Sequence, residues 1–216
     1  MSEENPTIAR ILHVSSSPRG DRSTSRKLAR EFLATWQSSH PGDTVTDRDV
    51  GHAPPAHVTE AWVAAAYAPA ETHTPEVAAA IRESDELVAE LFAHDVIVVS
   101  VPMSNFGIPS TLKAYIDNIV RVNKTFAMDF SQPNPYVPLV HGKKLYVLSS
   151  SGGAGYGPGG PLAGYNHETT YLQAIFAFLG VTDATVVQCE NANAPEPAKQ
   201  AGLDAAKSAA HDAAAA

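Results

Sequence analysis

Hydroxyl side chains gather near the start of the chain, in a segment that joins an apolar run to a helical pattern. Residues 15–25 read SSSPRGDRSTS. Hydroxyls and unpaired backbone N–H groups at a helix N-terminus suit a phosphate, because the helix dipole and the free donors both favour an anion. We interpret this segment as a candidate phosphate site, to which Arg19 or Arg22 would add positive charge. The simpler alternative is a polar turn in which Ser23 caps the helix.

A second candidate is the segment PMSNFGIP at residues 102–109. It combines a flexible thioether, an amide, an aromatic ring and two prolines, a mixture typical of a shaped ligand wall. Backbone groups held here would hydrogen-bond a flat heterocycle, while Met103 would cover its face. The alternative is an ordinary connection between a strand and a helix.

The third candidate is the glycine-rich segment SSSGGAGYG at residues 149–157. Its paired glycines allow the backbone to approach a ligand closely, although such a loop is often only flexible. Each of the three segments is a weak signal alone. Together they become stronger evidence for a ligand site if the fold brings them to the same edge of a sheet.

The elements that flank these segments predict such a fold. Apolar and alternating runs predict five strands, at residues 8–14, 44–50, 95–103, 144–150 and 183–189. Segments with helical spacing lie between them, at residues 25–36, about 58–67, about 74–92, 110–122 and 167–180. This order indicates an α/β protein with a doubly wound, five-stranded parallel sheet and helices on both faces. Ligands of such sheets bind beyond the carboxyl ends of the strands, where all three segments would meet.

The bulk composition favours one domain over residues 1–216. The chain has 216 residues, of which 44% are hydrophobic, so it can bury a sizeable core. We expect residues 123–142 to form a long excursion, and the Ala-rich tail at 195–216 to form a solvated helix. A formal charge of -8 argues against nucleic-acid binding, and no apolar run is long enough to span a membrane.

The cysteine content and the first residues predict a cytoplasmic protein. Cys189 is the only cysteine, so no intrachain disulfide can form, and its place at the end of a buried strand favours a core role. The N-terminal MSEENPTIAR is acidic and polar, unlike a signal peptide. The nine histidines are scattered, so we expect no metal site.

Three segments carry a family resemblance. They read SSSPRGDRSTSRKL, DVIVVSVPMSNFGIPSTLKAYID, and SSSGG ahead of HETTYLQAIFAFLGVTD. Together they resemble the FMN-dependent NADH-azoreductases and the wider group of NAD(P)H quinone reductases, from about residue 8 to residue 190. The middle segment is the most specific. The resemblance implies a flavodoxin-like fold.

The resemblance also implies roles for individual residues. Hydroxyl residues of the first segment would hold the FMN phosphate: Ser17, Ser23, Thr24 and Ser25. Residues of the second would line the isoalloxazine and ribityl chain: Met103, Ser104, Asn105 and Phe106. Residues of the third would meet the pyrimidine edge of the flavin: Ser150, Ser151, Gly152 and Gly153. Phe126 matches an aromatic residue that, in the family, leans over the flavin from the partner subunit of a homodimer.

The implied activity is reduction of quinones and azo compounds by NADH or NADPH. Two-electron, ping-pong hydride transfer would pass through N5 of the flavin, so no side chain need be a catalytic nucleophile. The chain departs from the family at two places. Ser104 stands where Tyr is common, and Ser151 where Arg is common. Substrate preference, nicotinamide preference and flavin potential therefore need not follow the family.

Other functions on this fold stay open. A flavodoxin-like electron-transfer protein would react with a protein partner, but the excursion at 123–142 suggests a covered small-molecule pocket. A non-flavin hydrolase is the other possibility, although the chain has no G-x-S-x-G nucleophile elbow. An NAD-binding dehydrogenase is disfavoured. Residues 155–160 match G-x-G-x-x-G formally, but they lie late in the chain, contain Pro158 and do not open directly into a helix.

Overall fold

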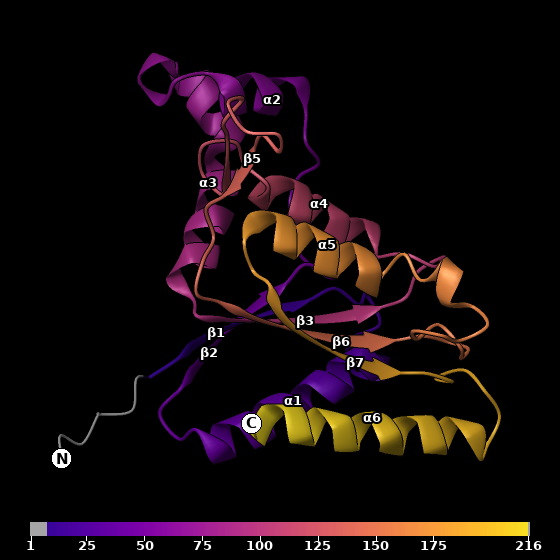
Figure 1. The fold of residues 1–216 in the computed structure, drawn as a ribbon. Helices are drawn as coiled ribbons and strands as arrows, with labels where there is room; N and C mark the ends of the chain where they lie inside the picture. The colour runs from indigo at the N-terminus through magenta and orange to yellow at the C-terminus, as the bar shows by residue number, and fades with distance from the viewer. Residues whose placement is uncertain (1–7, 216) are drawn as a thin grey trace.

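The computed structural model describes residues 8–215, and a parallel five-stranded sheet runs through the middle of them (Figure 1). Its strand order is β2-β1-β3-β6-β7, which is the flavodoxin-like order. The strands are β1 (Arg10–Ser15), β2 (Thr44–Asp49), β3 (Val96–Pro102), β6 (Lys144–Ser150) and β7 (Asp183–Cys189). The predicted fold class is confirmed, and every predicted strand agrees with the structure to within two residues.

Helices cover both faces of the sheet, as Figure 1 shows. One face packs against α1 (Thr24–Ser39) and α6 (Ala198–Ala215). The other packs against α3 (Pro75–Ala93), α4 (Ser110–Ile119) and α5 (Thr169–Leu179). Successive side chains of a strand point to opposite faces of the sheet, so Ile11 packs on the face covered by α1 and Leu12 on the face covered by α3. This two-sided burial explains why β3 is a continuous apolar run.

Local signals set several helix ends. The Ser23 hydroxyl accepts a hydrogen bond from Arg26 N–H at 3.3 Å, so the predicted N-cap of α1 is confirmed. Gly180 closes α5 in the left-handed conformation, with φ of 114°. A Cβ at Gly180 would lie 2.4 Å from the Val140 carbonyl oxygen, so glycine is required there.

Two helix predictions are corrected. The Ala-rich tail is a surface helix as predicted but is not solvated all round, because Ala206, Ala210 and Ala214 of α6 are buried in the core beside α1. α4 ends at Ile119, three residues earlier than predicted. The Thr125 hydroxyl donates to the Ile119 carbonyl at 2.7 Å and accepts from Arg121 N–H at 2.8 Å, which diverts the chain out of the helix.

The predicted excursion at 123–142 contains a small antiparallel pair that the sequence pattern did not reveal. β4 (Phe126–Met128) pairs with β5 (Tyr136–Pro138), and with α2 (Glu60–Tyr67) the pair lies above α4 and α5 in Figure 1. Short 3₁₀ turns lie at Gly20–Arg22, Ala70–Thr72 and Ala163–Tyr165.

None of the helices between residues 8 and 215 combines the length and the apolar character needed to cross a bilayer. The absence of a signal peptide was predicted largely from residues 1–7, which lie outside the described residues.

Candidate functional site

The carboxyl ends of four strands enclose a small cleft of about 80 Å³. Three loops contribute as predicted, and a fourth, after β7, was not predicted. The lining residues are Ser17, Arg19, Ser23, Thr24, Pro102, Met103, Ser150, Ser151, Gly152, Ala192 and Asn193. The fourth loop could have been predicted from the rule that ligands bind beyond the carboxyl ends of the strands, because the segment after β7 begins at the same edge of the sheet.

The first loop forms the polar end of the cleft. Ser17 and Ser23 are buried, and the Ser17 hydroxyl accepts the Arg19 N–H at 3.3 Å. Ser25 is fully buried and does not line the cleft; its hydroxyl lies 3.2 Å from that of Ser23. Among the described residues that line the cleft, Arg19 is the one charged side chain. Arg22 is exposed and is not among them.

This polar end fits a phosphate. The geometry of α1 leaves the N–H groups of its first turn without partners inside the helix, and Thr24 is the first residue of that turn. Hydroxyls, free N–H groups and a guanidinium are the donor set that binds anions at helix N-termini.

The second loop forms a tight turn at the rim. Ser104 and Gly107 exchange backbone hydrogen bonds of 2.8 and 2.9 Å, and the residues between them are left-handed, with φ of 48° at Asn105 and 69° at Phe106. Such conformations are uncommon away from glycine and cluster at functional sites. Ser104, Asn105 and Phe106 are exposed, so they lie at the rim and not inside the cleft.

Backbone contacts tie the third loop to its neighbours. Met103 N–H donates to the Ser150 carbonyl at 2.8 Å, and Ser151 N–H donates to the Cys189 carbonyl at 3.0 Å. The Ser151 hydroxyl, at the position where Arg is common, folds the loop by donating to the Gly153 carbonyl at 2.9 Å. A Cβ at Gly152 would lie 2.8 Å from Asn193 Nδ2, so the two loops touch closely.

A buried carboxyl group lies next to this loop. The Ser149 hydroxyl donates to Glu168 Oε2 at 2.9 Å, whereas Oε1 has no hydrogen-bond partner among the described residues. Glu168 has no exposed surface, and burial raises its pKa to about 8. In the sequence this residue looks like an ordinary acid at a helix start, so no local signal predicted its burial.

Phe126 does not lie at the cleft. Its ring is 8% exposed and packs 5.1 Å from the ring of Phe178 and 6.2 Å from that of Tyr136. The resemblance places this aromatic residue over the flavin of a partner subunit, and that role for Phe126 stays a prediction. Phe130, in the same excursion, is 81% exposed.

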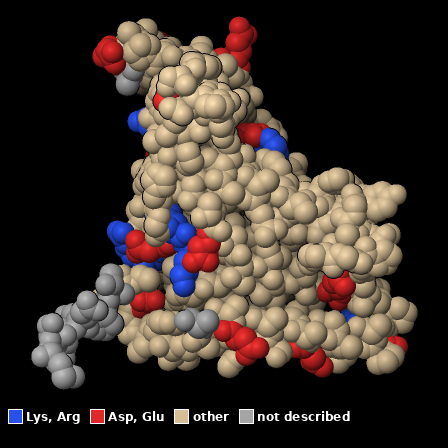
Figure 2. Space-filling view, in the orientation of Figure 1, with Lys and Arg blue, Asp and Glu red and all other residues tan. Residues whose placement is uncertain are grey.

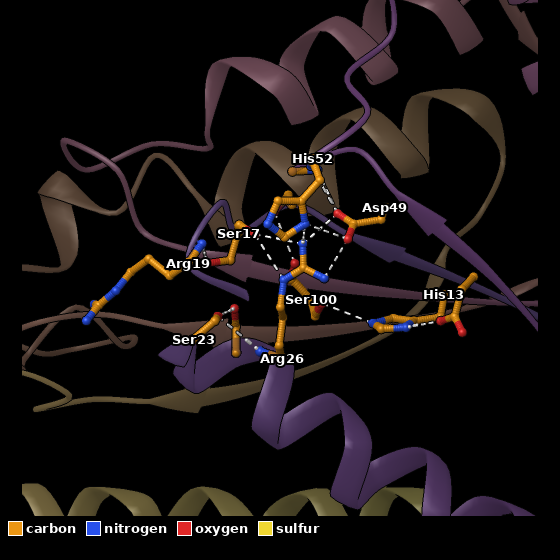
Figure 3. Close-up of polar contacts among 12 residues, drawn as sticks. His13, Ser17, Arg19, Ser23, Arg26, Asp49, His52 and Ser100 are labelled. Atoms are coloured by element: carbon orange, nitrogen blue, oxygen red, sulfur yellow. Dashed lines mark hydrogen bonds and ion pairs between the residues drawn. The ribbon is translucent and has the colours of Figure 1, made fainter. Parts of the chain in front are cut away.

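Three strands also bring together an Asp–His–Ser chain, shown in Figure 3. His13 Nδ1 lies 2.7 Å from Asp47 Oδ1, and His13 Nε2 lies 3.0 Å from Ser100 Oγ. The order of groups is that of an acyl-transfer triad. Ser100 has no exposed surface, however, so a substrate cannot reach its hydroxyl. We interpret this row of three side chains as a hydrogen-bonded link between β2, β1 and β3.

Among residues 8–215, no group of three or more His, Cys, Asp or Glu side chains is arranged to hold a metal ion.

Comparison with known proteins gives a consistent result. A family model described as a flavodoxin-like fold matches residues 9–213. An FMN-dependent NADH:quinone oxidoreductase 2 of Trichormus variabilis is 51% identical over 202 residues, which are 94% of this chain and 96% of the relative. An FMN-dependent NADH:quinone oxidoreductase 1 of Pseudomonas fluorescens is 46% identical over 193 residues, which are 88% and 90% of the two chains. The crystal structure of an azoreductase from Bacillus anthracis is similar with a TM-score of 0.86 at 26% identity, over 96% of this chain and 99% of that chain.

Proposed function

This chain belongs to the flavodoxin-like fold family, and from that premise we propose that it is an FMN-dependent NADH:quinone oxidoreductase that also reduces azo compounds. The observation that carries the proposal is the cleft itself. A cationic, hydroxyl-lined end at the start of α1 continues into a wall formed by Met103 and the Ser150–Gly152 loop. That arrangement suits a flat ring system that carries a phosphate.

The residues of the cleft fit FMN. Its phosphate would be held by the hydroxyls of Ser17, Ser23 and Thr24 and by the charge of Arg19. Its ring would lie along Met103 and the 150–152 loop. Ser104, Asn105, Phe106 and Gly153 would contact FMN from the rim of the cleft. Ser25 is buried behind the lining residues and would act through Ser23, whose hydroxyl lies 3.2 Å from its own.

Bound FMN would supply two-electron hydride chemistry between NADH or NADPH and a quinone or azo acceptor. The chain's own residues position the reactants and set the local charge. The backbone N–H groups of Gly152 and Gly153 would stabilise negative charge near the pyrimidine edge. Burial raises the pKa of Glu168 to about 8, so this side chain is mostly protonated at neutral pH and adds little negative charge behind that loop. The mechanism needs no nucleophilic side chain.

The two alternatives are less well supported. The fully buried Ser100 gives a hydrolase no accessible nucleophile in the Asp–His–Ser chain. A flavodoxin-like electron carrier is disfavoured by the relatives, which are named FMN-dependent NADH:quinone oxidoreductases.

We expect the purified protein to retain FMN and to be reduced by NADH. The protein is mixed with FMN, excess flavin is removed, and the visible spectrum is recorded. A retained, perturbed flavin band should be bleached by NADH without acceptor in anaerobic stopped flow, and it should return when a quinone is added. A colourless protein would contradict the proposal. A bound flavin that neither NADH nor NADPH bleaches would favour the electron carrier.

We also propose a homodimer in which the second copy completes the site. The cleft of one chain is much smaller than the roughly 300–1,000 Å³ of ordinary ligand pockets, so a flavin ring would project beyond it. The centre of the face in Figure 2 is nearly free of charged side chains. Apolar side chains are exposed on α2 and in the excursion: Val63, Tyr67, Met128, Phe130, Tyr136 and Val137.

Sedimentation equilibrium should therefore give twice the mass of one chain. Phe130→Asp should shift the protein toward the one-chain mass, because a charge would be buried at the interface. Lys27→Asp, on exposed α1 surface, is the control and should leave the mass unchanged. A one-chain mass for the unmodified protein would rule out the dimer.

A cytoplasmic location belongs to the same proposal, since the single cysteine is free and buried, in keeping with a reducing compartment.

A further inference from the structure

The Arg26 guanidinium, in the first turn of α1, joins the loop after β1 to the end of β2 (Figure 3). Its Nε and Nη2 donate to the Ser17 carbonyl oxygen at 2.9 and 2.7 Å. Its Nη1 and Nη2 donate to the Asp49 carboxylate at 2.9 and 2.5 Å. Arg26 does not line the cleft. The guanidinium therefore acts on the protein backbone and not on a ligand in the cleft.

The partner carboxylate is firmly held. Asp49 Oδ1 also accepts the Gly51 N–H at 3.0 Å, and Oδ2 lies 2.8 Å from His52 Nδ1. Burial alone would raise the pKa of Asp49, but hydrogen bonds from Arg26 and His52 outweigh burial and hold it well below its usual range. The carboxylate thus stays ionised and largely neutralises the charge of Arg26.

Gly51 approaches the same carbonyl group. A Cβ at this position would lie 2.6 Å from the Ser17 oxygen and 2.9 Å from Arg26 Nη2, so only glycine fits here. Gly51 is itself fixed, because its N–H donates to the Ser15 carbonyl at 3.1 Å. The Ser17 oxygen is therefore enclosed by Arg26 and Gly51, on the side of the loop that faces β2.

The direction of this carbonyl matters because the next residue is Pro18. Proline has no backbone N–H, so the Ser17–Pro18 peptide can present only an acceptor oxygen. If that oxygen turned toward the cleft, its partial negative charge would face a bound phosphate with no donor to compensate. Arg26 holds the oxygen away, while the Ser17 hydroxyl stays on the cleft side with Arg19 N–H.

We propose that Arg26 is a positioning residue for the cofactor phosphate, which it serves through the Ser17 carbonyl without touching the phosphate. The inference rests on the proposed function, because it takes the anion at this loop to be the FMN phosphate. Riboflavin has the same ring system and no phosphate, so it reports on the rest of the site.

The test compares the two flavins on wild-type and variant protein freed of bound flavin, by fluorescence titration. Arg26→Gln should weaken FMN binding at least 10-fold and change riboflavin binding less than twofold. Arg30→Gln is the matched control, one turn further along α1 and paired with the exposed Asp21 at 2.8 Å. It should bind FMN as the wild type does.

Two further variants separate orientation from charge. Arg26→Lys keeps the positive charge but lacks the planar fork of donors, so it should lose FMN affinity as the glutamine variant does. Gly51→Ala should displace the Ser17 carbonyl while Arg26 remains, and it should give the same FMN-selective loss. If Arg26→Gln does not fold, the comparison of FMN and riboflavin binding by Gly51→Ala tests the proposal instead.

Three results would overturn the positioning role: full FMN affinity in Arg26→Gln, full recovery in Arg26→Lys, or an equal loss for both flavins. Wild-type protein that fails to bind FMN would instead overturn the proposed function.

Discussion

Replacing Glu168 by glutamine should remove a loss of stability that the wild type suffers as the pH rises. Relative to wild type, the variant should gain about 3 kcal/mol in free energy of unfolding between pH 5 and pH 8. The reason is the burial of a carboxyl group with one unpartnered oxygen.

The direction of the effect follows from proton release. Burial raises the pKa of Glu168 in the folded protein to about 8, from an ordinary value of 4.5. Between these values the folded chain keeps the proton and the unfolded chain releases it. Each pH unit in this interval therefore lowers the free energy of unfolding by about 1.4 kcal/mol. The contribution is fully present below pH 4.5 and is lost as the pH rises toward 8, and glutamine has no such proton to release.

Urea denaturation of the flavin-free protein at pH 5, 6.5 and 8 measures this slope. Glu86→Gln, on the exposed surface of α3, is the control and should keep the wild-type slope. Parallel pH profiles for wild type and Glu168→Gln would show that the carboxyl is already ionised at neutral pH. Other groups near the loop, such as His167 and Glu190, are common to both proteins and cancel in the comparison.

The sheet was predictable because its signals are local. Val96–Pro102 is apolar without interruption, which is what burial on both faces requires. Alternation of such runs with helical segments leaves few topologies, and the carboxyl ends of parallel strands must then share an edge. Ser17, Met103 and Ser150 could be assigned to one site for that reason alone.

The contacts that complete the site were not predictable, because they depend on register and burial. His13 and Asp47 are cross-strand partners in β1 and β2, and Arg26 meets Asp49 only because the first turn of α1 and the end of β2 come together in the fold. No periodicity carries such information. Phe126 was assigned by resemblance alone, and its packing against Phe178 could not be read from the sequence.

Replacing Thr24 by glutamate should separate cofactor binding from stability. Thr24 is the first residue of α1, is partly exposed and lines the cationic end of the cleft. An acid in the first turn of a helix is stabilising by about 0.3–1 kcal/mol, because it complements the helix dipole. The fold should therefore tolerate the change, with an unaltered or slightly raised melting temperature.

The same carboxylate would stand beside the phosphate, and like charges a few ångströms apart repel strongly near a protein surface. FMN affinity should fall by at least about 100-fold, which corresponds to about 2.8 kcal/mol, whereas riboflavin affinity should change only a few fold. Thr24→Gln is the control, because glutamine has nearly the shape of glutamate and carries no charge. It should bind FMN much more tightly than the glutamate variant. If Thr24→Glu binds FMN as well as Thr24→Gln does, the phosphate lies elsewhere and the start of α1 is not the anion site. If FMN and riboflavin lose affinity equally, the substitution has disturbed the ring site, and the charge argument fails.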